Sequence, residues 1–468
     1  MVFSSLLFFF YFLPLTLLLY YIAPARLKNA VLFAASLVFY AWGEPVYVFL
    51  MLASTAFDYA NGLLLDKFRE RRGVARAILL FSLAGSLGVL GFFKYAGFVA
   101  DNLNQWLGLS LSVPELPLPV GISFYTFQTM SYIVDVYRGK VAAQKNMLSF
   151  GLYVAMFPQL VAGPIIQYGE IARQLVARTV TFGQFGEGAA LLVRGLAKKV
   201  LLANNIGLLW SDVKATPPDE LTTFLAWLGI VAFAFQIYFD FSGYSDMARG
   251  LGKMFGFDFM GNFRYPYMSK SISEFWRRWH ISLGSWFREY VYIPLGGNRA
   301  GLLRQSANLL AVWFLTGLWH GASWNFVIWG VYFGLFIILE KWLLLRLLQK
   351  VHAAVGYVYT LVVVLIGWVF FECASLPVAW QFLRAMFGFA GQGFMDNQAL
   401  YYWSTNWLLL LVLAICSTPL PEKAAALLRD RRHLLGGAVA AAVHIGLLLL
   451  STAFLVDETY NPFLYFRF

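Results

Sequence analysis

Two histidines are the residues of this chain best suited to proton-transfer chemistry. The sequence has five histidines among 468 residues: His280 lies in RRWHISLGSWFRE, and His320 lies inside a long apolar run, in GLWHGAS. Burial penalises the charged form of an imidazole, and a neutral imidazole can act as a general base near neutral pH. An ionisable side chain at membrane depth is costly and therefore indicates a function. We expect His320 to be catalytic; the alternative is a buried histidine that hydrogen-bonds a neighbouring helix.

The elements around His320 must be membrane elements. Residues 308–339 carry no Asp, Glu, Lys or Arg, and the run exceeds the roughly 20 residues that one crossing needs. Glycines and an asparagine interrupt it, so we expect two membrane elements that meet near the histidine. On a helix, His320 would share a face with a narrow strip of polar and small residues that could border a cavity: Thr316, Gly317 and Ser323.

His280 follows a helix-start signal. Ser271 with Glu274 three residues later is a capping box. From there to about Tyr290, an aromatic side that includes His280 lies opposite an arginine side, which predicts one helix on the membrane surface. The imidazole would point into protein or lipid, and Arg277 and Arg278 would hold it neutral by repulsion. His280 could position a substrate, orient His320 or simply pack between tryptophans.

A carboxylate lies at the inner end of another apolar span. Asp240 stands in QIYFDFSGYSD. It could contribute to the site, or it could form a structural ion pair with an arginine from the basic region 244–305. Asp246 and Arg249 are three residues apart and should pair locally.

Composition predicts a polytopic helical membrane protein. The chain is 60% hydrophobic and carries many separate apolar runs. No stretch is polar enough for a second, soluble domain, so residues 1–468 should form one membrane domain. The net charge of +11 comes from basic residues in short links, which is the positive-inside pattern rather than a nucleic-acid site. Links 66–76 and 244–305 should be cytoplasmic, which puts the N-terminus outside.

The apolar runs predict roughly eleven or twelve crossings. Residues 147–166 contain Pro158, Gly163 and Pro164, which favour a re-entrant hairpin over an uninterrupted crossing. The other predicted spans lie near 3–23, 29–44, 46–64, 77–98, 120–137, 187–210, 221–243, 353–373, 403–420 and 434–456, besides the two elements at 308–339.

Several enzyme classes lack their sequence signals. The chain has no G-x-S-x-G elbow, H-E-x-x-H motif, Walker loop or G-x-G-x-x-G fingerprint. Its two cysteines and its His/Asp/Glu spacing provide no metal set and no resident cofactor. Serine-triad hydrolysis, ATP-driven pumping and nicotinamide chemistry are therefore unsupported.

Several long motifs resemble the membrane-bound O-acyltransferase (MBOAT) family, in its bacterial branch that O-acetylates alginate or cellulose. The resemblance covers most of the chain to about residue 345. It is carried by EFWRRWHISLGSWFREYVYIPLGGNR (274–299), GLWHGA (317–322), GISFYTFQTMSYIVDVYRG (121–139), FPQLVAGPI (157–165) and YFDFSGYSDMARG (238–250).

The resemblance implies a ring of helices with re-entrant elements around a central tunnel, with a catalytic core at about 120–345. It makes His320 the catalytic histidine and His280 the second polar position. Arg277, Arg278, Asp240, Trp319 and Ser323 are candidates for substrate or donor binding. The donor would be acetyl-CoA, and a periplasmic acetyltransferase partner would complete transfer to an exopolysaccharide, in the inner membrane of a Gram-negative cell.

Other functions stay open at this point. The same fold could transfer D-alanyl groups to teichoic acid or acetylate peptidoglycan. A different class is a non-catalytic export channel for the polysaccharide, which would have a wide polar pore and tolerate loss of His320.

Overall fold

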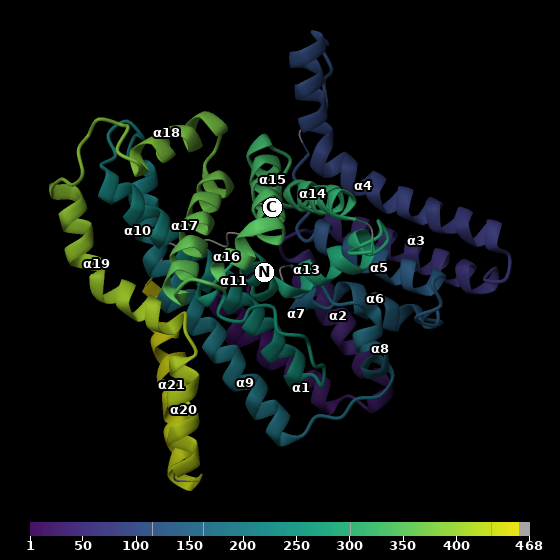
Figure 1. The fold of residues 1–468 in the computed structure, drawn as a ribbon. Helices are drawn as coiled ribbons and strands as arrows, with labels where there is room; N and C mark the ends of the chain where they lie inside the picture. Colours follow the sequence, from purple (N-terminus) through teal and green to yellow (C-terminus); the bar gives the residue numbers. More distant parts are fainter. Residues whose placement is uncertain (115, 162, 300, 432, 458–468) are drawn as a thin grey trace. The chain divides into compact units, whose positions relative to one another are not determined.

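The structure is a computed structural model that describes residues 1–457 except 115, 162, 300 and 432. Within these residues every regular element is a helix and there is no strand (Figure 1). Helices long and apolar enough to cross a membrane confirm the predicted all-α polytopic fold. Among the described residues these are α3 (Tyr47–Lys67), α4 (Arg72–Leu107), α11 (Thr223–Met254), α15 with its extension (Trp324–Leu348), α17 (Ala353–Glu372), α19 (Asn397–Cys416) and Gly436–Asp457 of α21.

The chain folds into two compact units that interleave along the sequence. The first contains residues 1–192 and 244–260, and the second contains residues 193–243 and the chain from 261 onward. Two helices, α9 (Phe182–Ala197) and α11, run from one unit into the other. The single membrane domain expected from composition stays a prediction.

The first unit holds the N-terminal helices and a broken segment at 147–166. There α6 ends at Ala155, Met156 leaves the helix with ψ 113°, and α7 lasts for a single turn before irregular backbone follows. Phe157 and Gln159 are buried, as irregular backbone at membrane depth requires. The helix is interrupted as predicted, while the re-entrant course of this segment stays a prediction. The other elements before α9 are η1 (Phe8–Phe12), α1 (Leu13–Ile22), η2 (Ala25–Leu27), α2 (Lys28–Ala41), α5 (Ile122–Tyr137), α6 (Met147–Ala155), α7 (Phe157–Leu160) and α8 (Tyr168–Val176).

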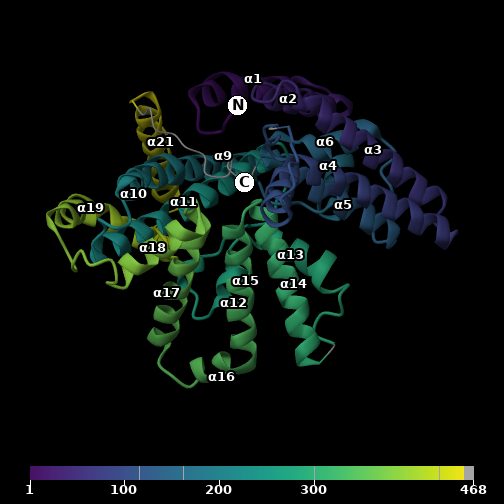
Figure 2. The same ribbon diagram turned by 90° about the horizontal axis from the view of Figure 1, so that it is seen from above.

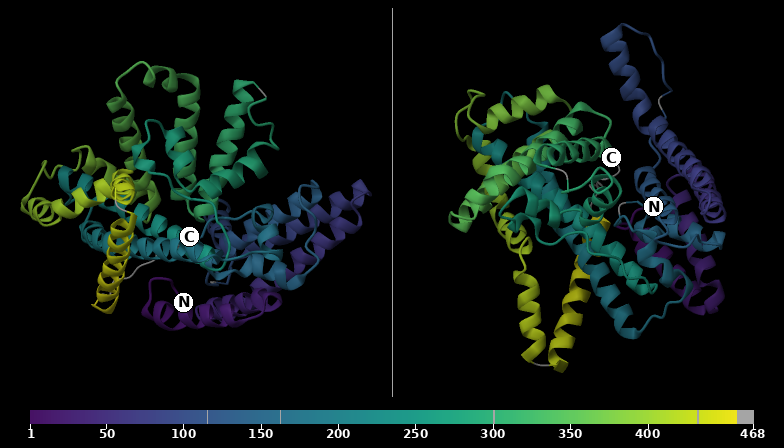
Figure 3. Two further views of the ribbon diagram at one scale, coloured as in Figure 1. Left: turned by 90° about the horizontal axis from the view of Figure 1, so that it is seen from below. Right: turned by 45° about the vertical axis from the view of Figure 1, so that its right-hand side comes forward.

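A buried carboxylate joins α3 to α4 in the first unit, where the two helices lie side by side (Figure 3). Asp58 on α3 is 1% exposed. It accepts hydrogen bonds from the Ser82 hydroxyl at 2.8 Å and from the Ser86 hydroxyl at 3.2 Å, both on α4. Since the Asp58 carboxylate is buried away from water, its hydrogen bonds to these hydroxyls fix how α3 and α4 face each other.

The second unit packs around tryptophans. The ring centroids of Trp276 and Trp313 are 4.8 Å apart, and Trp276 lies 5.5 Å from Trp329. The helices α14 and α15 lie side by side in this unit (Figure 2). Its further elements are η3 (Lys198–Asn204), α10 (Asn205–Ala215), η4 (Pro266–Met268), α12 (Ile272–Arg278), α13 (Ile281–Phe287), η5 (Arg288–Tyr292), α14 (Leu302–His320), α15 (Trp324–Leu339), η6 (Glu340–Leu344), α16 (Leu345–Leu348), α18 (Leu376–Met386), α20 (Leu420–Arg431) and α21 (His433–Asp457).

Removing the Asp58 carboxylate should destabilise the first unit. In Asp58→Ala the buried hydroxyl of Ser82 and the half-buried hydroxyl of Ser86 lose their acceptor, so we expect the free energy of unfolding to fall by about 1–3 kcal/mol. Thermal unfolding of the purified protein in detergent measures this. The control is Asp101→Ala, since Asp101 is an exposed carboxylate on α4. Equal stability of the two variants would show that the Asp58 hydrogen bonds do not hold the helices.

Candidate active site

His320 is the last residue of α14. Gly321 follows in an extended conformation and ends the helix, and α15 begins at Trp324 with Ser323 as its N-cap. The prediction of two elements that meet near the histidine is confirmed. The chain thus places an imidazole at the junction of two helices.

Glycines let α14 and α15 approach each other this closely. A Cβ atom on Gly317 would overlap the backbone carbonyl of Phe326, and a Cβ atom on Gly321 would overlap the Phe326 ring. Small residues at a helix interface permit such backbone contact. We expected a strip at Gly317 and Ser323 that could border a cavity; instead Gly317 lies in a packing contact.

The His320 ring is held by its own helix. Its Nδ1 lies 2.7 Å from the carbonyl oxygen of Thr316. A carbonyl oxygen can only accept, so Nδ1 must be the ring nitrogen that carries the proton. In the neutral ring the lone pair is then on Nε2. A histidine held in this tautomer is suited to remove a proton with Nε2.

Aromatic rings surround the imidazole. The ring centroid of His320 lies 4.9 Å from Trp319, 4.7 Å from Trp329 and 5.5 Å from Phe371. The side chain is buried, with 3% of the residue exposed. This is a low-dielectric environment, in which charge that develops during a reaction interacts strongly with fixed dipoles.

His280 lies between two short helices, so the single helix predicted from Ser271 to Tyr290 is wrong. Its φ of 46° and ψ of 53° put it in the left-handed region. The cause is Asn262, whose backbone carbonyl accepts from the Ile281 N–H at 3.0 Å and whose side chain accepts from the Ser282 N–H at 3.0 Å. These bonds replace the helical ones. A strained residue of this kind persists only where its surroundings determine it, often at functional sites.

The prediction that His280 points into protein is confirmed. It is 2% exposed, its Nδ1 lies 3.4 Å from the Asn262 side-chain oxygen, and its ring contacts Phe241 at 4.7 Å between centroids. Trp319 lies 5.9 Å from His280 and is also in contact with His320. One tryptophan therefore links the two histidines.

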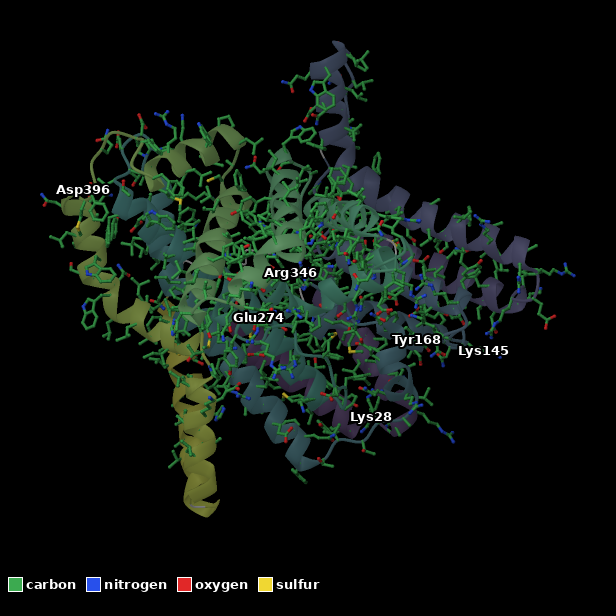
Figure 4. The ribbon with its side chains drawn as sticks, in the orientation of Figure 1. Lys28, Lys145, Tyr168, Glu274, Arg346 and Asp396 are labelled. Atoms are coloured by element: carbon green, nitrogen blue, oxygen red, sulfur yellow. The ribbon has the colours of Figure 1, made fainter. Side chains whose placement is uncertain are left out.

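Burial lowers the pKa of His280 well below its usual range, and the neighbouring His320 lowers it further. We attributed a neutral His280 to repulsion from the adjacent arginines, and that cause is wrong. Arg278 instead pairs with Glu274 at 2.6 Å, and Arg277 donates to the carbonyl of Ser273. Figure 4 labels Glu274 on α12.

The aromatic and arginine sides of this segment are confirmed in part. Phe275, Trp279 and Trp286 are buried, while Arg277 and Arg288 are exposed. Ser282, which we placed on the arginine side, is 1% exposed because it binds Asn262. The aromatic side packs into the second unit, and the position of this segment at a membrane surface stays a prediction.

Two different groups fix the start of α12. Ser271 caps it as predicted, with its hydroxyl accepting from the Glu274 N–H at 3.0 Å. Sequence reasoning missed Glu340, which is fully buried and accepts from the backbone N–H groups of Ile272 at 2.5 Å and Ser273 at 2.8 Å. The signal was present, since Glu340 is the first charged residue after a long apolar run. A carboxylate at a helix N-terminus also complements the helix dipole.

Asp240 forms an ion pair, but with a different partner from the one expected. Its carboxylate lies 2.7 Å from the Lys199 ammonium, and both side chains are at most 3% exposed. Lys199 belongs to the π-helical turn η3 rather than to the basic region 244–305. Asp246 and Arg249 pair at 3.6 Å, as predicted. Asp240 is followed in the chain by Phe241, whose ring contacts His280.

The structure therefore brings three of the predicted site residues together: His280, Trp319 and His320. Asp240 pairs with Lys199, and the residue after it, Phe241, contacts His280. Arg277 and Arg278 bond to other residues at α12, namely Ser273 and Glu274, and Ser323 is the N-cap residue of α15. Their predicted roles in substrate binding stay predictions.

Comparison with known proteins places this geometry in a family. The sequence profile of the MBOAT, membrane-bound O-acyltransferase family matches residues 141–376. The protein named probable alginate O-acetylase AlgI of Azotobacter vinelandii is 40% identical over the full length of both chains. Its namesake in Pseudomonas aeruginosa is 44% identical over 83% of this chain and 75% of the relative. The peptidoglycan O-acetyltransferase of Helicobacter pylori is 33% identical over 84% of this chain and 80% of the relative.

Replacing one partner of the Lys199–Asp240 pair should destabilise the protein more than replacing both partners. In Lys199→Met the Asp240 carboxylate stays buried without its cation, so we expect a loss of about 3–5 kcal/mol of stability. The double variant Lys199→Met with Asp240→Leu should recover much of that loss. Thermal unfolding of wild type, both single variants and the double variant measures the coupling. Strictly additive effects would show that the pair does not interact energetically.

Proposed function

Because this chain belongs to the membrane-bound O-acyltransferase family and is a multi-pass acyltransferase, we propose that it O-acetylates an exopolysaccharide of the alginate type. The observation that carries the proposal is His320: a buried imidazole, held through Nδ1 by the Thr316 carbonyl, at the junction of two helices. Full-length similarity to an alginate O-acetylase supports the choice of acceptor.

The proposed donor is a cytoplasmic thioester, acetyl-CoA, and the acceptor is a hydroxyl group. His320 Nε2 takes the proton of the acceptor hydroxyl while the hydroxyl oxygen attacks the thioester carbonyl. The new C–O bond forms, the C–S bond breaks, and the imidazolium returns the proton to the leaving thiolate. In the other route, Nε2 itself attacks the thioester carbonyl, the C–S bond breaks and the coenzyme leaves as its thiolate. The acceptor oxygen then takes the acetyl group from the acyl-histidine, the N–C bond breaks, and the hydroxyl proton goes to the thiolate. Both routes need the lone pair on Nε2.

His280 would assist this reaction through Trp319. The tryptophan is in ring contact with both histidines, so a fixed His280 holds one wall of the site in place. Arg277 and Arg278 would bind the phosphates of the coenzyme. We include Asp240, Trp319 and Ser323 in the proposed substrate-binding set.

Access to His320 is narrow, since 3% of the residue is exposed. In the proposed relay the acetyl group arrives from the cytoplasm and leaves toward the outside, through a tunnel that opens to both faces. The bulky coenzyme then stays on its own side.

The proposal includes a cellular setting. Basic residues in the link between α3 and α4 favour a cytoplasmic position, which puts the N-terminus in the periplasm of a Gram-negative cell. A periplasmic acetyltransferase would then complete transfer to the polymer. Peptidoglycan O-acetylation is the second candidate, favoured by the 33% identity to an enzyme of that name.

Loss of His320 should abolish acetylation. We expect His320→Ala to lower the O-acetyl content of the secreted polymer by roughly a hundredfold or more, because the variant lacks the imidazole proposed to take the hydroxyl proton. The assay is acetyl release from polymer made by a host that lacks its own copy of the protein. His444→Ala is a matched control, since His444 makes the same bond to a carbonyl four residues earlier, at 2.7 Å. Wild-type acetyl content in a well-expressed His320→Ala variant would contradict the proposal.

His280 should contribute less than His320. We choose His280→Asn because asparagine tolerates the left-handed backbone, so the loss of the imidazole is separated from backbone strain. The same acetylation assay should show roughly a tenfold decrease, while the melting temperature stays close to that of wild type. Unchanged activity would assign His280 to packing alone.

A further inference from the structure

A cavity lined by arginines lies at one end of α3, α4 and α5 in the first unit. Its volume is about 390 Å³, within the range of small-molecule sites. Six residues line it: Leu65, Arg69, Arg72, Ala75, Tyr137 and Arg138. None of them belongs to the site around His320.

The cavity lies where the membrane meets water. Both α3 and α4 are long and apolar enough to cross a membrane, and the few residues between Lys67 and Arg72 connect them. The connection therefore lies at a membrane surface. Leu65 is 2% exposed and Ala75 is 3% exposed, while the arginines are exposed. The cavity thus combines an apolar inner wall with a cationic mouth.

Three arginines line the cavity and no carboxylate does. The buried Asp135 near the end of α5 is paired with Lys140 at 3.7 Å. Within the part of the chain that the structure describes, neither Arg69 nor Arg72 forms an ion pair.

A glycine leaves room for the Arg69 guanidinium beside the end of α5. Gly139, just after α5, has a φ of 70°, and a Cβ atom there would overlap Nη2 of Arg69. The left-handed conformation and the missing side chain let the guanidinium lie close to the backbone beyond Arg138. Arginines from two separate segments, 69–72 and 138, are therefore brought to one cavity.

We propose that this cavity binds a phosphate group, carried by an anionic phospholipid or by free phosphate. The guanidinium fork matches phosphate oxygens and can bind them through two parallel hydrogen bonds. Basic pockets between transmembrane helices at a membrane surface bind lipid headgroups in this way. The apolar wall formed by Leu65 and Ala75 suits the glycerol and acyl portion of a lipid. This inference does not depend on the acetyl-transfer proposal.

The test compares two charge-matched double variants of the full chain. Arg69→Gln with Arg72→Gln removes two arginines of the cavity. Arg71→Gln with Arg76→Gln removes two exposed arginines of the same region that do not line it. Each protein is reconstituted into phosphatidylcholine nanodiscs with or without phosphatidylglycerol. Native mass spectrometry then counts the retained phosphatidylglycerol, and melting temperatures with inorganic phosphate are measured in neutral detergent.

We expect the cavity variant to bind phosphatidylglycerol roughly tenfold more weakly than wild type, and the control variant to bind it as wild type does. This result identifies a lipid site. A free-phosphate site would give a different result. Wild type would not retain phosphatidylglycerol, and inorganic phosphate would raise the melting temperature of wild type and the control variant but not that of the cavity variant. Equal losses in both variants, or no selective binding by wild type, would overturn the proposal. Arg72→Gln alone serves if the double variant does not fold, with the same criteria against Arg76→Gln.

Discussion

The hydrogen bond from His320 Nδ1 to the Thr316 carbonyl is the interaction on which the rest of the site depends. It uses an acceptor of the same helix, so the tautomer of the ring needs no partner from another element. It also requires α14 to remain helical up to its last residue and then to turn. The glycines at 317 and 321 meet that need by letting α15 pack directly against the end of α14. The ring nitrogen that carries the proton is therefore set by backbone geometry.

Polar groups elsewhere in the chain follow the same physical rule. A charge at low dielectric is costly unless fixed partners surround it. The Asp240 carboxylate has the Lys199 ammonium, the Glu340 carboxylate has two backbone N–H groups, and Asp58 has two serine hydroxyls. Two of these groups lie near the histidines in the chain: Asp240 precedes Phe241, which contacts His280, and Glu340 fixes the start of the helix that ends before His280.

Much of this organisation was readable from the sequence because it follows local patterns. Apolar runs predicted most of the long helices, the capping box predicted the start of α12, and a histidine within an apolar run predicted the junction at His320. The break at His280 could not be predicted, since it depends on Asn262, eighteen residues earlier, replacing helical hydrogen bonds. The partner of Asp240 was also assigned wrongly, because it too is set by a contact between residues far apart in the sequence. A sequence shows that a buried carboxylate needs a cation, while only the packing of α11 against η3 selects Lys199.

The most direct test of this account is the protonation state of the His320 ring. Nitrogen-15 NMR of membrane-embedded protein with labelled histidine separates the two tautomers, and the spectrum of His320→Ala assigns the signal. The account predicts a ring protonated at Nδ1 with an unprotonated Nε2, because Nδ1 must donate to the Thr316 carbonyl. A ring protonated at Nε2 in the resting protein would contradict it, since the nitrogen assigned to take the proton of the acceptor hydroxyl would already carry one.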